Sequence, residues 1–248
     1  MLKLRVTNLL VAALFMLTGG AFAQGAVGNA RQSNTVTKDL DNCRQAIIYV
    51  EADGDIYKEG VRIGTDAVDY KADCNGNVVW LEDNGDIYNN DRRIGSYAAQ
   101  FDIAMLSGDI VWMEKGGEIY KNDRRIGSWA KQFEIAYTGD IVWLEDGGDI
   151  HKNDQRIGSW AKQFKISKYT GDIAWLEDNG DIYKNDRRIG SWAKQFDIAL
   201  RTGDIAWMES SGNIYKNDRR IGSWAVEFVL YPDGRLKWKE SNGDWHIA

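Results

Sequence analysis

Apolar and polar residues alternate over short stretches along most of this chain, as they do in strands with one buried face. Between Gln132 and Arg156, Phe133, Ile135 and Tyr137 alternate with polar or small residues. The next run, Ile141 to Leu144, is apolar at every position, which is typical of an interior strand covered on both faces. The pattern therefore predicts a half-buried strand followed by a fully buried one.

Residues that favour tight turns separate these runs. Thr138-Gly139-Asp140 follows the first strand, and Asp146-Gly147-Gly148-Asp149 follows the second. A sister copy has Asp83-Asn84-Gly85 at the second turn, and Asn-Gly between apolar runs is a strong hairpin signal. A third short strand, a turn at Asn90-Asp91 and a fourth short strand from Arg92 complete the unit. We expect an antiparallel meander of four strands, named a, b, c and d in chain order.

The unit repeats with a period of 31 or 32 residues. An anchor aromatic in strand b marks each copy: Tyr49, Trp80, Trp112, Trp143, Trp175, Trp207 and Trp238. A strict period of this length indicates a repeat architecture, in which each unit buries its apolar face against its neighbours. Because the chemically interesting residues recur from copy to copy, the pattern argues against a catalytic centre, which needs different residues that converge once.

Sequential hairpins argue against a β-solenoid, whose coils stack in parallel. Helical repeats are excluded because the one helix-compatible piece, Ser128 to Gln132, allows a single turn at most. Tandem meanders that are apolar on both faces can close into a ring that hides their sheet edges. The sequence thus predicts an all-β fold, a seven-bladed β-propeller of short four-stranded antiparallel blades of about 31 residues each.

The number of strands sets how the ring closes. Strands b and c occur seven times, whereas strands a and d occur six times, because the chain ends after the last strand c at Gly243 to His246. We expect Ser33 to Thr37 to supply the missing outer strand as a clasp, and Lys38 to Asp41 to supply a first strand a. The alternative is a six-bladed ring with an extra hairpin.

The run from Ile126 to Ala136, the Gly-Asp-Ile-Val-Trp run of strand b and the Asn-Gly-Asp-Ile-Tyr hairpin arm resemble the tectonin-type repeat of β-propeller lectins. The similarity covers about Arg44 to Ala248. That family usually carries a tryptophan early in the outer strand, where this chain has Arg-Arg, as at Arg92 and Arg93. The resemblance implies a propeller that binds glycans or surface ligands without catalysis.

The first 23 residues have the pattern of a secretory signal peptide, with Lys3 and Arg5, an apolar stretch from Leu9 to Leu17 and Ala-Phe-Ala before Gln24. We expect a signal peptide at 1–23, an N-terminal segment with the clasp strand at 24–43 and the repeat domain at 44–248. No later run is long enough to span a membrane. The expected location is the periplasm or the medium.

Removing the leader leaves 29 basic and 37 acidic residues, a formal charge of −8. An acidic chain repels phosphate backbones, so nucleic acid and anionic membranes are not expected as partners. Cys43 and Cys74 lie one period apart at equivalent places, and an oxidising compartment favours a disulfide between them at turns near the central axis. A loop of this length contributes about 3–4 kcal/mol in the chain-entropy model.

We expect neither a metal nor a cofactor. The only histidines are His151 and His246, neither of which is expected to recur between repeats, and His151 reads as a tolerated replacement of a tyrosine. Turns such as Asp53-Gly54-Asp55 lack the remaining ligands of a calcium loop. No Ser-His-Asp set, Cys-His set or nucleotide fingerprint is present.

Two series of aromatic residues recur. Those of strand b should pack between blades. Those of the second series follow Gly-Ser between one blade and the next: Tyr97, Trp129, Trp160, Trp192 and Trp224. Exposed indole faces can stack on the apolar faces of sugars, so we predict these residues as ligand-binding. The alternative is a second wedge between blades.

The polar turn between strands c and d, Lys-Asn-Asp-Arg-Arg, is nearly identical between copies, whereas the turn between b and c varies. We predict its Asp123, Arg124, Asp186 and Arg187 as further ligand-binding residues. The alternatives are protection of the outer strand from edge-to-edge pairing and recent duplication.

The sequence therefore favours an exported, non-catalytic, multivalent binding module whose ligand is a glycan or cell-surface molecule. Weak identical sites around a ring gain affinity through effective concentration. The alternative is a protein-interaction scaffold of the bacterial envelope. A hydrolase has the least support, because the sequence contains no asymmetric catalytic set.

Overall fold

The computed structural model describes Cys43 and residues 46–248, and this part of the chain consists of 26 β strands without a helix. Within it there is accordingly no apolar helix of membrane-spanning length. The segments 1–42 and 44–45 lie outside the described residues. They include the expected signal peptide, the clasp strand at Ser33 to Thr37 and the first strand a at Lys38 to Asp41.

Each repeat folds into the strands that the hydrophobic pattern predicts. Strand a is six residues long and comprises β4 (Ala67–Ala72), β8 (Ala98–Ile103), β12 (Ala130–Ile135), β16 (Ala161–Ile166), β20 (Ala193–Ile198) and β24 (Ala225–Leu230). Strand b comprises β1 (Ile48–Val50), β5 (Val78–Glu82), β9 (Ile110–Glu114), β13 (Ile141–Glu145), β17 (Ile173–Glu177), β21 (Ile205–Glu209) and β25 (Leu236–Glu240).

The two outer strands are shorter. Strand c comprises β2 (Ile56–Lys58), β6 (Ile87–Asn89), β10 (Ile119–Lys121), β14 (Ile150–Lys152), β18 (Ile182–Lys184), β22 (Ile214–Lys216) and β26 (Trp245–Ile247). Strand d comprises β3 (Val61–Gly64), β7 (Arg92–Gly95), β11 (Arg124–Gly127), β15 (Gln155–Gly158), β19 (Arg187–Gly190) and β23 (Arg219–Gly222).

The strands form seven antiparallel sheets, which are the seven blades of a β-propeller. Five sheets have four strands in the order a-b-c-d, whereas the described part of the first (β1-β2-β3) has no strand a and that of the last (β24-β25-β26) has no strand d. The predicted meander and the predicted number of blades are confirmed, and the six-bladed alternative is wrong. The predicted closure by an N-terminal strand lies outside the described residues and stays a prediction.

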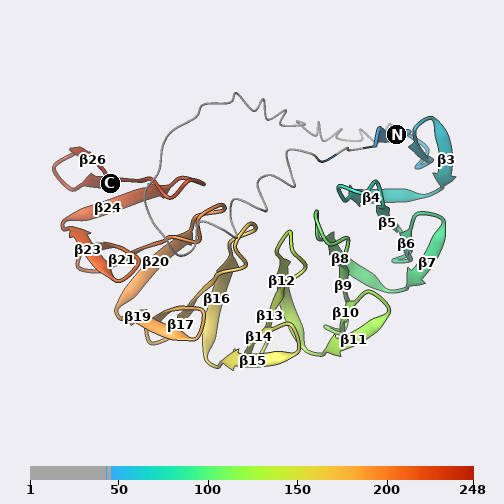
Figure 1. The fold of residues 1–248 in the computed structure, drawn as a ribbon. Coiled ribbons are helices and arrows are strands. Elements are labelled where there is room, and N and C mark those ends of the chain that lie inside the picture. Colours follow the sequence, from blue (N-terminus) through green and yellow to red (C-terminus); the bar gives the residue numbers. More distant parts are fainter. Residues whose placement is uncertain (1–42, 44–45) are drawn as a thin grey trace, which may run out of the picture.

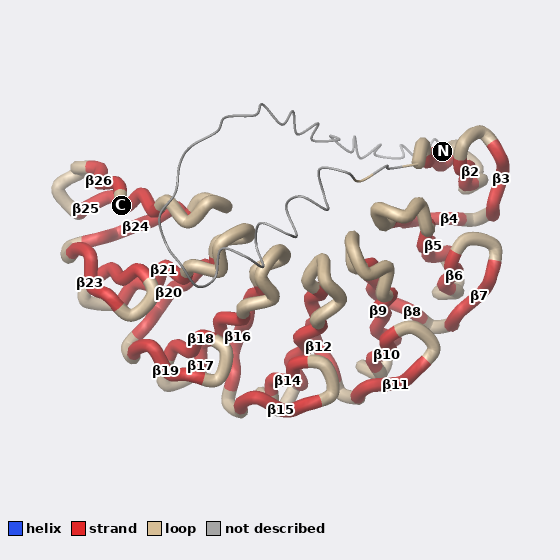
Figure 2. The backbone as a smooth tube through the Cα atoms, in the orientation of Figure 1, coloured by secondary structure: helices blue, strands red, loops and turns tan. Residues whose placement is uncertain are grey.

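The blades stand side by side along an arc, with the first and the last at its two ends (Figure 1). The d strands β7, β11, β15, β19 and β23 lie on the outer rim, and each a strand runs inwards from that rim. The turns between strands a and b reach the inner rim (Figure 2). The described residues leave the arc open between the last blade and the first.

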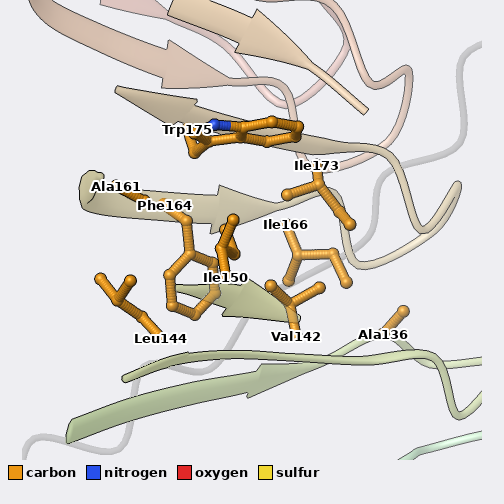
Figure 3. Close-up of a cluster of buried hydrophobic side chains, with 9 residues drawn as sticks. All are labelled: Ala136, Val142, Leu144, Ile150, Ala161, Phe164, Ile166, Ile173 and Trp175. Carbon is orange, nitrogen blue, oxygen red and sulfur yellow. The ribbon is translucent and has the colours of Figure 1, made fainter. Parts of the chain in front are cut away.

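The hydrophobic core lies between blades, as the apolar b strands predict. In the cluster of Figure 3, Val142, Leu144 and Ile150 of one blade pack against Phe164 and Trp175 of the next. The strand-b tryptophans from Trp80 to Trp238 are buried. Each lies against the glycine that ends the preceding strand d: a Cβ on Gly158 would lie 3.1 Å from the indole of Trp175. The prediction that these aromatics pack between blades is confirmed.

An aromatic residue of strand c stacks on each strand-b tryptophan, as Tyr183 does on Trp175 with ring centroids 4.9 Å apart. His151 and His246 occupy this same place and stack on their own blades' tryptophans. The statement that neither histidine recurs is therefore wrong, because the two are equivalent residues of the fourth and seventh blades. The equivalence of the two histidines is not evident in the sequence, because the fifth and sixth blades, which lie between theirs, have tyrosine at this position.

At the inner rim, backbone hydrogen bonds connect the a–b turns of successive blades. Cys74 donates its N–H to the carbonyl of Met105 (2.9 Å), and Leu106 donates to Tyr137 (2.9 Å) in the same way. Cys43 and Cys74 form the predicted disulfide, with their Cα atoms 4.7 Å apart. The first blades are thus fixed covalently at the rim where neighbouring turns meet.

Candidate ligand-binding sites

Two residues, serine and an aromatic, connect each strand d to strand a of the next blade over most of the arc. The aromatic side chains of these d–a junctions, Tyr97, Trp129, Trp160, Trp192 and Trp224, are 69–74% exposed. They are therefore not buried wedges between blades, which was the alternative interpretation of this series. Asp66 takes the same place at the first junction.

The backbone of these aromatics is in the left-handed region, with φ between 56° and 63° for the four tryptophans and 58° for Tyr97. Bulky residues rarely adopt this conformation. The chain also has left-handed residues in its c–d turns. The first turn has Glu59 (φ 50°), and the next five use asparagine with φ of 53° to 56°: Asn90, Asn122, Asn153, Asn185 and Asn217. Asparagine tolerates this geometry at lower cost, so the tryptophans are not explained by the turn itself.

Hydrogen bonds from two blades hold the junction at Trp160, and the same pair recurs at Tyr97, Trp129 and Trp224, whereas the described contacts at Trp192 include only the bond from Ala193 to Gly180 of the preceding blade. Ala161, which follows Trp160, donates its N–H to the carbonyl of Gly148 in the b–c turn of the preceding blade (2.8 Å). The carbonyl of Trp160 accepts from Asp178 in the b–c turn of its own blade (3.3 Å). The backbone is thus anchored on both sides while the indole extends into solvent.

The junction between the fifth and sixth blades forms a notch of about 520 Å³ beside Trp192. Its walls are the b–c turns of the two blades, and its lining residues are Asp178, Asn179, Gly180, Trp192, Ala193, Glu209, Ser210 and Ser211. An exposed aromatic face beside carboxylates, an amide and hydroxyls is an arrangement that can stack on a ring and bond its hydroxyl groups.

Glu209 is fixed in this notch. Its carboxylate accepts hydrogen bonds from Ser211 (2.8 Å), Asn213 (2.7 Å) and Tyr215 (2.8 Å). Burial acts to raise the pKa of this carboxyl, but the three hydrogen bonds and the positive charge of Arg220 outweigh burial and lower the pKa below its ordinary value. Glu209 is therefore a charged, oriented acceptor at neutral pH.

The b–c turns themselves are supported by the second arginine of strand d. Arg156 binds Asp149 (3.0 Å) and Arg93 binds Asp86 (3.2 Å) within their own blades. The hydrogen bond from Arg156 is the main reason why the pKa of Asp149 is lowered. Because the b–c turns vary in sequence between copies, the sequence did not predict Asp178, Glu209 and Ser211 as candidate site residues.

The near-identity of the c–d turns in successive repeats has a structural explanation. The side-chain oxygen of Asn122 accepts from the N–H of Ile110 (2.9 Å) in its own blade. Lys121 donates to the carbonyl of Gly139 in the next blade (2.8 Å) and forms an ion pair with Asp109 (3.0 Å). These contacts fix each turn against its own blade and its neighbour.

The four predicted tip residues lie at these turns, at the opposite end of strand d from the aromatics. Arg92 binds Asp123 (2.7 Å), Arg124 binds Asp154 (3.4 Å) and Arg187 binds Asp218 (3.3 Å), each pair joining neighbouring blades. At Asp186 the preceding blade has Gln155 in place of the arginine, and both residues line a pocket of about 420 Å³. The structure therefore does not bring the tip residues and the aromatics into one site.

A larger pocket of about 570 Å³ lies on the inner side of the first five blades. Of its charged lining residues, Lys71 binds Asp102 (3.1 Å), and Lys168 lies 3.7 Å from Glu134 beside the pocket. Burial raises the pKa of Glu134, and Lys168 opposes this effect. The pair of Lys71 and Asp102 recurs as Lys165 and Asp197 (2.8 Å), the fifth residues of β16 and β20.

One group in the described part of the chain combines a histidine with two carboxylates, namely Glu145, Asp149 and His151, whose ligand atoms lie within 4.8 Å of one another. His151 contacts Glu145 at 2.9 Å, and Asp149 is engaged by Arg156. The guanidinium beside these carboxylates disfavours a second cation, so the group is accounted for by its own contacts.

No protein-family profile matches the chain, and no curated protein matches its sequence. Among solved structures, Kluyveromyces lactis Hsv2 is similar over 74% of both chains, with 14% identity and a TM-score of 0.41. The WD40 β-propeller domain of Doa1 matches with 10% identity over 82% of this chain and 91% of its own (TM-score 0.37). The β-propeller domain of Myceliophteria thermophila Cps50 (Swd1) matches with 7% identity over the same shares (TM-score 0.40). Similarity this low carries no argument about function. The functional argument rests on the chain's own residues.

Proposed function

We propose that this chain is an exported, non-catalytic lectin-like β-propeller that binds glycans at its d–a junctions, as the resemblance to tectonin-type repeats implies. The observation that carries the proposal is the left-handed, exposed aromatic residue at five successive junctions. Conformational strain of this kind persists where a side chain is needed in a fixed place. An indole there offers a rigid apolar face to a sugar ring.

The notch chemistry supports a sugar as the ligand. Carboxylate, amide and hydroxyl groups surround Trp192 on the two b–c turns, and they can bond the hydroxyls that point outwards from a stacked sugar. Five junctions along one rim give the chain several weak sites, so a repeating or branched glycan would bind through effective concentration.

The second candidate is a protein-interaction scaffold, for which exposed tryptophans also serve as anchors. A flat apolar contact would not need the polar walls of the notch, which is why we favour the glycan. Isolation of one stoichiometric protein partner through the rim tryptophans, without sugar competition, would favour the scaffold instead.

The test is a glycan array, followed by titration of the hits with quenching of tryptophan fluorescence as the readout. Trp160→Ala with Trp192→Ala should weaken binding by about fivefold for each site, since an aromatic contact of this kind is worth about 1 kcal/mol. Trp245→Ala is the matched control, because Trp245 is an exposed tryptophan of β26 outside the junctions. Unchanged binding in the double variant would refute the stacking role.

A further inference from the structure

We propose that the notch beside Trp192 selects sugars that carry a protonated amine over neutral and acidic sugars. This inference rests on the proposed function and adds the class of ligand. It follows from the charges that line the notch, from the position of the indole and from a comparison between equivalent junctions of the same chain.

The lining of the notch is anionic. Asp178 and Glu209 supply two carboxylates from opposite blades, and the other polar lining residues, Asn179, Ser210 and Ser211, are neutral. No lysine or arginine is among the lining residues of this notch. An ammonium group placed between the two blades would therefore meet acceptors of opposite charge, which form stronger hydrogen bonds than neutral acceptors do.

The indole adds to the same preference. Trp192 is exposed beside the carboxylates, and the face of an indole attracts cations. A stacked amino sugar would thus present its apolar face to the ring and its ammonium group to Asp178 and Glu209. A uronate or a sulfated sugar would place a negative charge beside the same carboxylates, and like charges exclude a ligand by repulsion.

Glu209 is suited to this role because three neighbouring donors hold its carboxylate, so binding does not have to order it. The backbone of Asp178 is fixed, since its N–H donates to the carbonyl of Trp160 at the adjacent junction, while its side chain is exposed. Glu209 is therefore the acceptor that is positioned before a ligand arrives.

The chain contains a natural reversal of this charge. In the b–c turn that precedes each junction, the residue equivalent to Asp178 is Asp83 before Tyr97, Lys115 before Trp129, Asp146 before Trp160 and Ser210 before Trp224. The geometry is equivalent, because Ala130 donates to Gly117 (2.9 Å) as Ala193 donates to Gly180 (2.9 Å). The junction at Trp129 thus carries a cation where the junction at Trp192 carries an anion.

The experiment isolates one notch. In the full chain, Tyr97, Trp129, Trp160 and Trp224 are changed to alanine, and binding at Trp192 is followed by fluorescence quenching at pH 6 and low salt. The probes are the disaccharide of glucosamine and its N-acetylated counterpart, which differ in charge. We expect the glucosamine disaccharide to bind about fivefold more tightly, the upper range for an exposed ion pair.

Asp178→Asn should lower the ratio of the two affinities, because Glu209 is then the one carboxylate left in the lining, and Asp178→Lys should bring the ratio to one or below. Asp91→Asn, the same chemical change in a c–d turn away from every junction, should leave the ratio as it was. A second background that retains only Trp129 should show a weaker preference for the amine, because Lys115 replaces the aspartate while Asp146 takes the place of Ser210 in the facing turn.

Equal affinities in the starting background, or a ratio that Asp178→Asn leaves unchanged, would overturn the charge selection while leaving glycan binding in place. Binding of neither disaccharide to the otherwise unchanged chain, together with an empty glycan array, would overturn the proposed function as well. The two failures are therefore distinguishable.

Discussion

At the scale of single residues, the aromatic series at the junctions could be found from the sequence, but its exposure could not. Hydrophobic patterning places tryptophan in a core by default, and Trp160 follows a glycine and a serine in a run that reads as connecting apolar strands. What decides its exposure is a φ of 61°, which turns the side chain away from the blades. A single backbone angle in a two-residue connection leaves no periodic signal.

The left-handed conformation gives a prediction about stability. Trp192→Asn places a residue that tolerates φ of 63° where a strained tryptophan now stands. Strain of this kind costs on the order of 1–3 kcal/mol. The free energy of unfolding of the variant should therefore be unchanged or higher by up to about 1 kcal/mol, while the share of sugar-dependent quenching that comes from Trp192 is lost. Urea denaturation measures the first effect. A loss of more than about 1 kcal/mol would show that the indole stabilises the fold.

At the scale of the strands, turn residues and apolar runs predicted the meander and its order, but not its bulges. In strand a of the fourth blade, Ala130 and Phe133 are both buried although they lie three positions apart. A regular strand would point them to opposite faces. A one-residue register shift between Ala130 and Gln132 reconciles them, and the same shift recurs in every described strand a. The extra residue looks like ordinary alternation in the sequence.

The contact between strand d and the next strand b predicts which glycines are indispensable. A Cβ on Gly190 would overlap the indole of Trp207, so Gly190→Ala forces the blades apart and should lower the free energy of unfolding by about 1–3 kcal/mol. Gly147→Ala is the matched control, because a Cβ there meets nothing within 4 Å. Denaturation curves that coincide for the two variants would contradict this account of inter-blade packing.

At the scale of the whole molecule, the period predicted seven blades because a strict repeat fixes the number of units. The sequence was a poorer guide to which turns of the molecule bind a ligand. The near-identity of the c–d turns suggested that a ligand binds there. In the structure, however, Asn122 bonds to its own blade and Lys121 bonds to the next blade, so these residues fix the turn in place. Identity between copies is required wherever identical blades contact one another, so it does not distinguish a binding site from an interface.

The disulfide tests how far the blades depend on one another. Cys43 and Cys74 close a loop of 31 residues, and its reduction should cost about 3–4 kcal/mol in the chain-entropy model. In a repeat protein, stability is carried by contacts between neighbouring units, so the loss should be largest in the first two blades. Hydrogen exchange under mild reduction should therefore accelerate at Val79 of β5, whereas Ala206 of β21, equally buried but four blades away, should exchange as before. Equal acceleration at both positions would mean that the arc unfolds as a single cooperative unit.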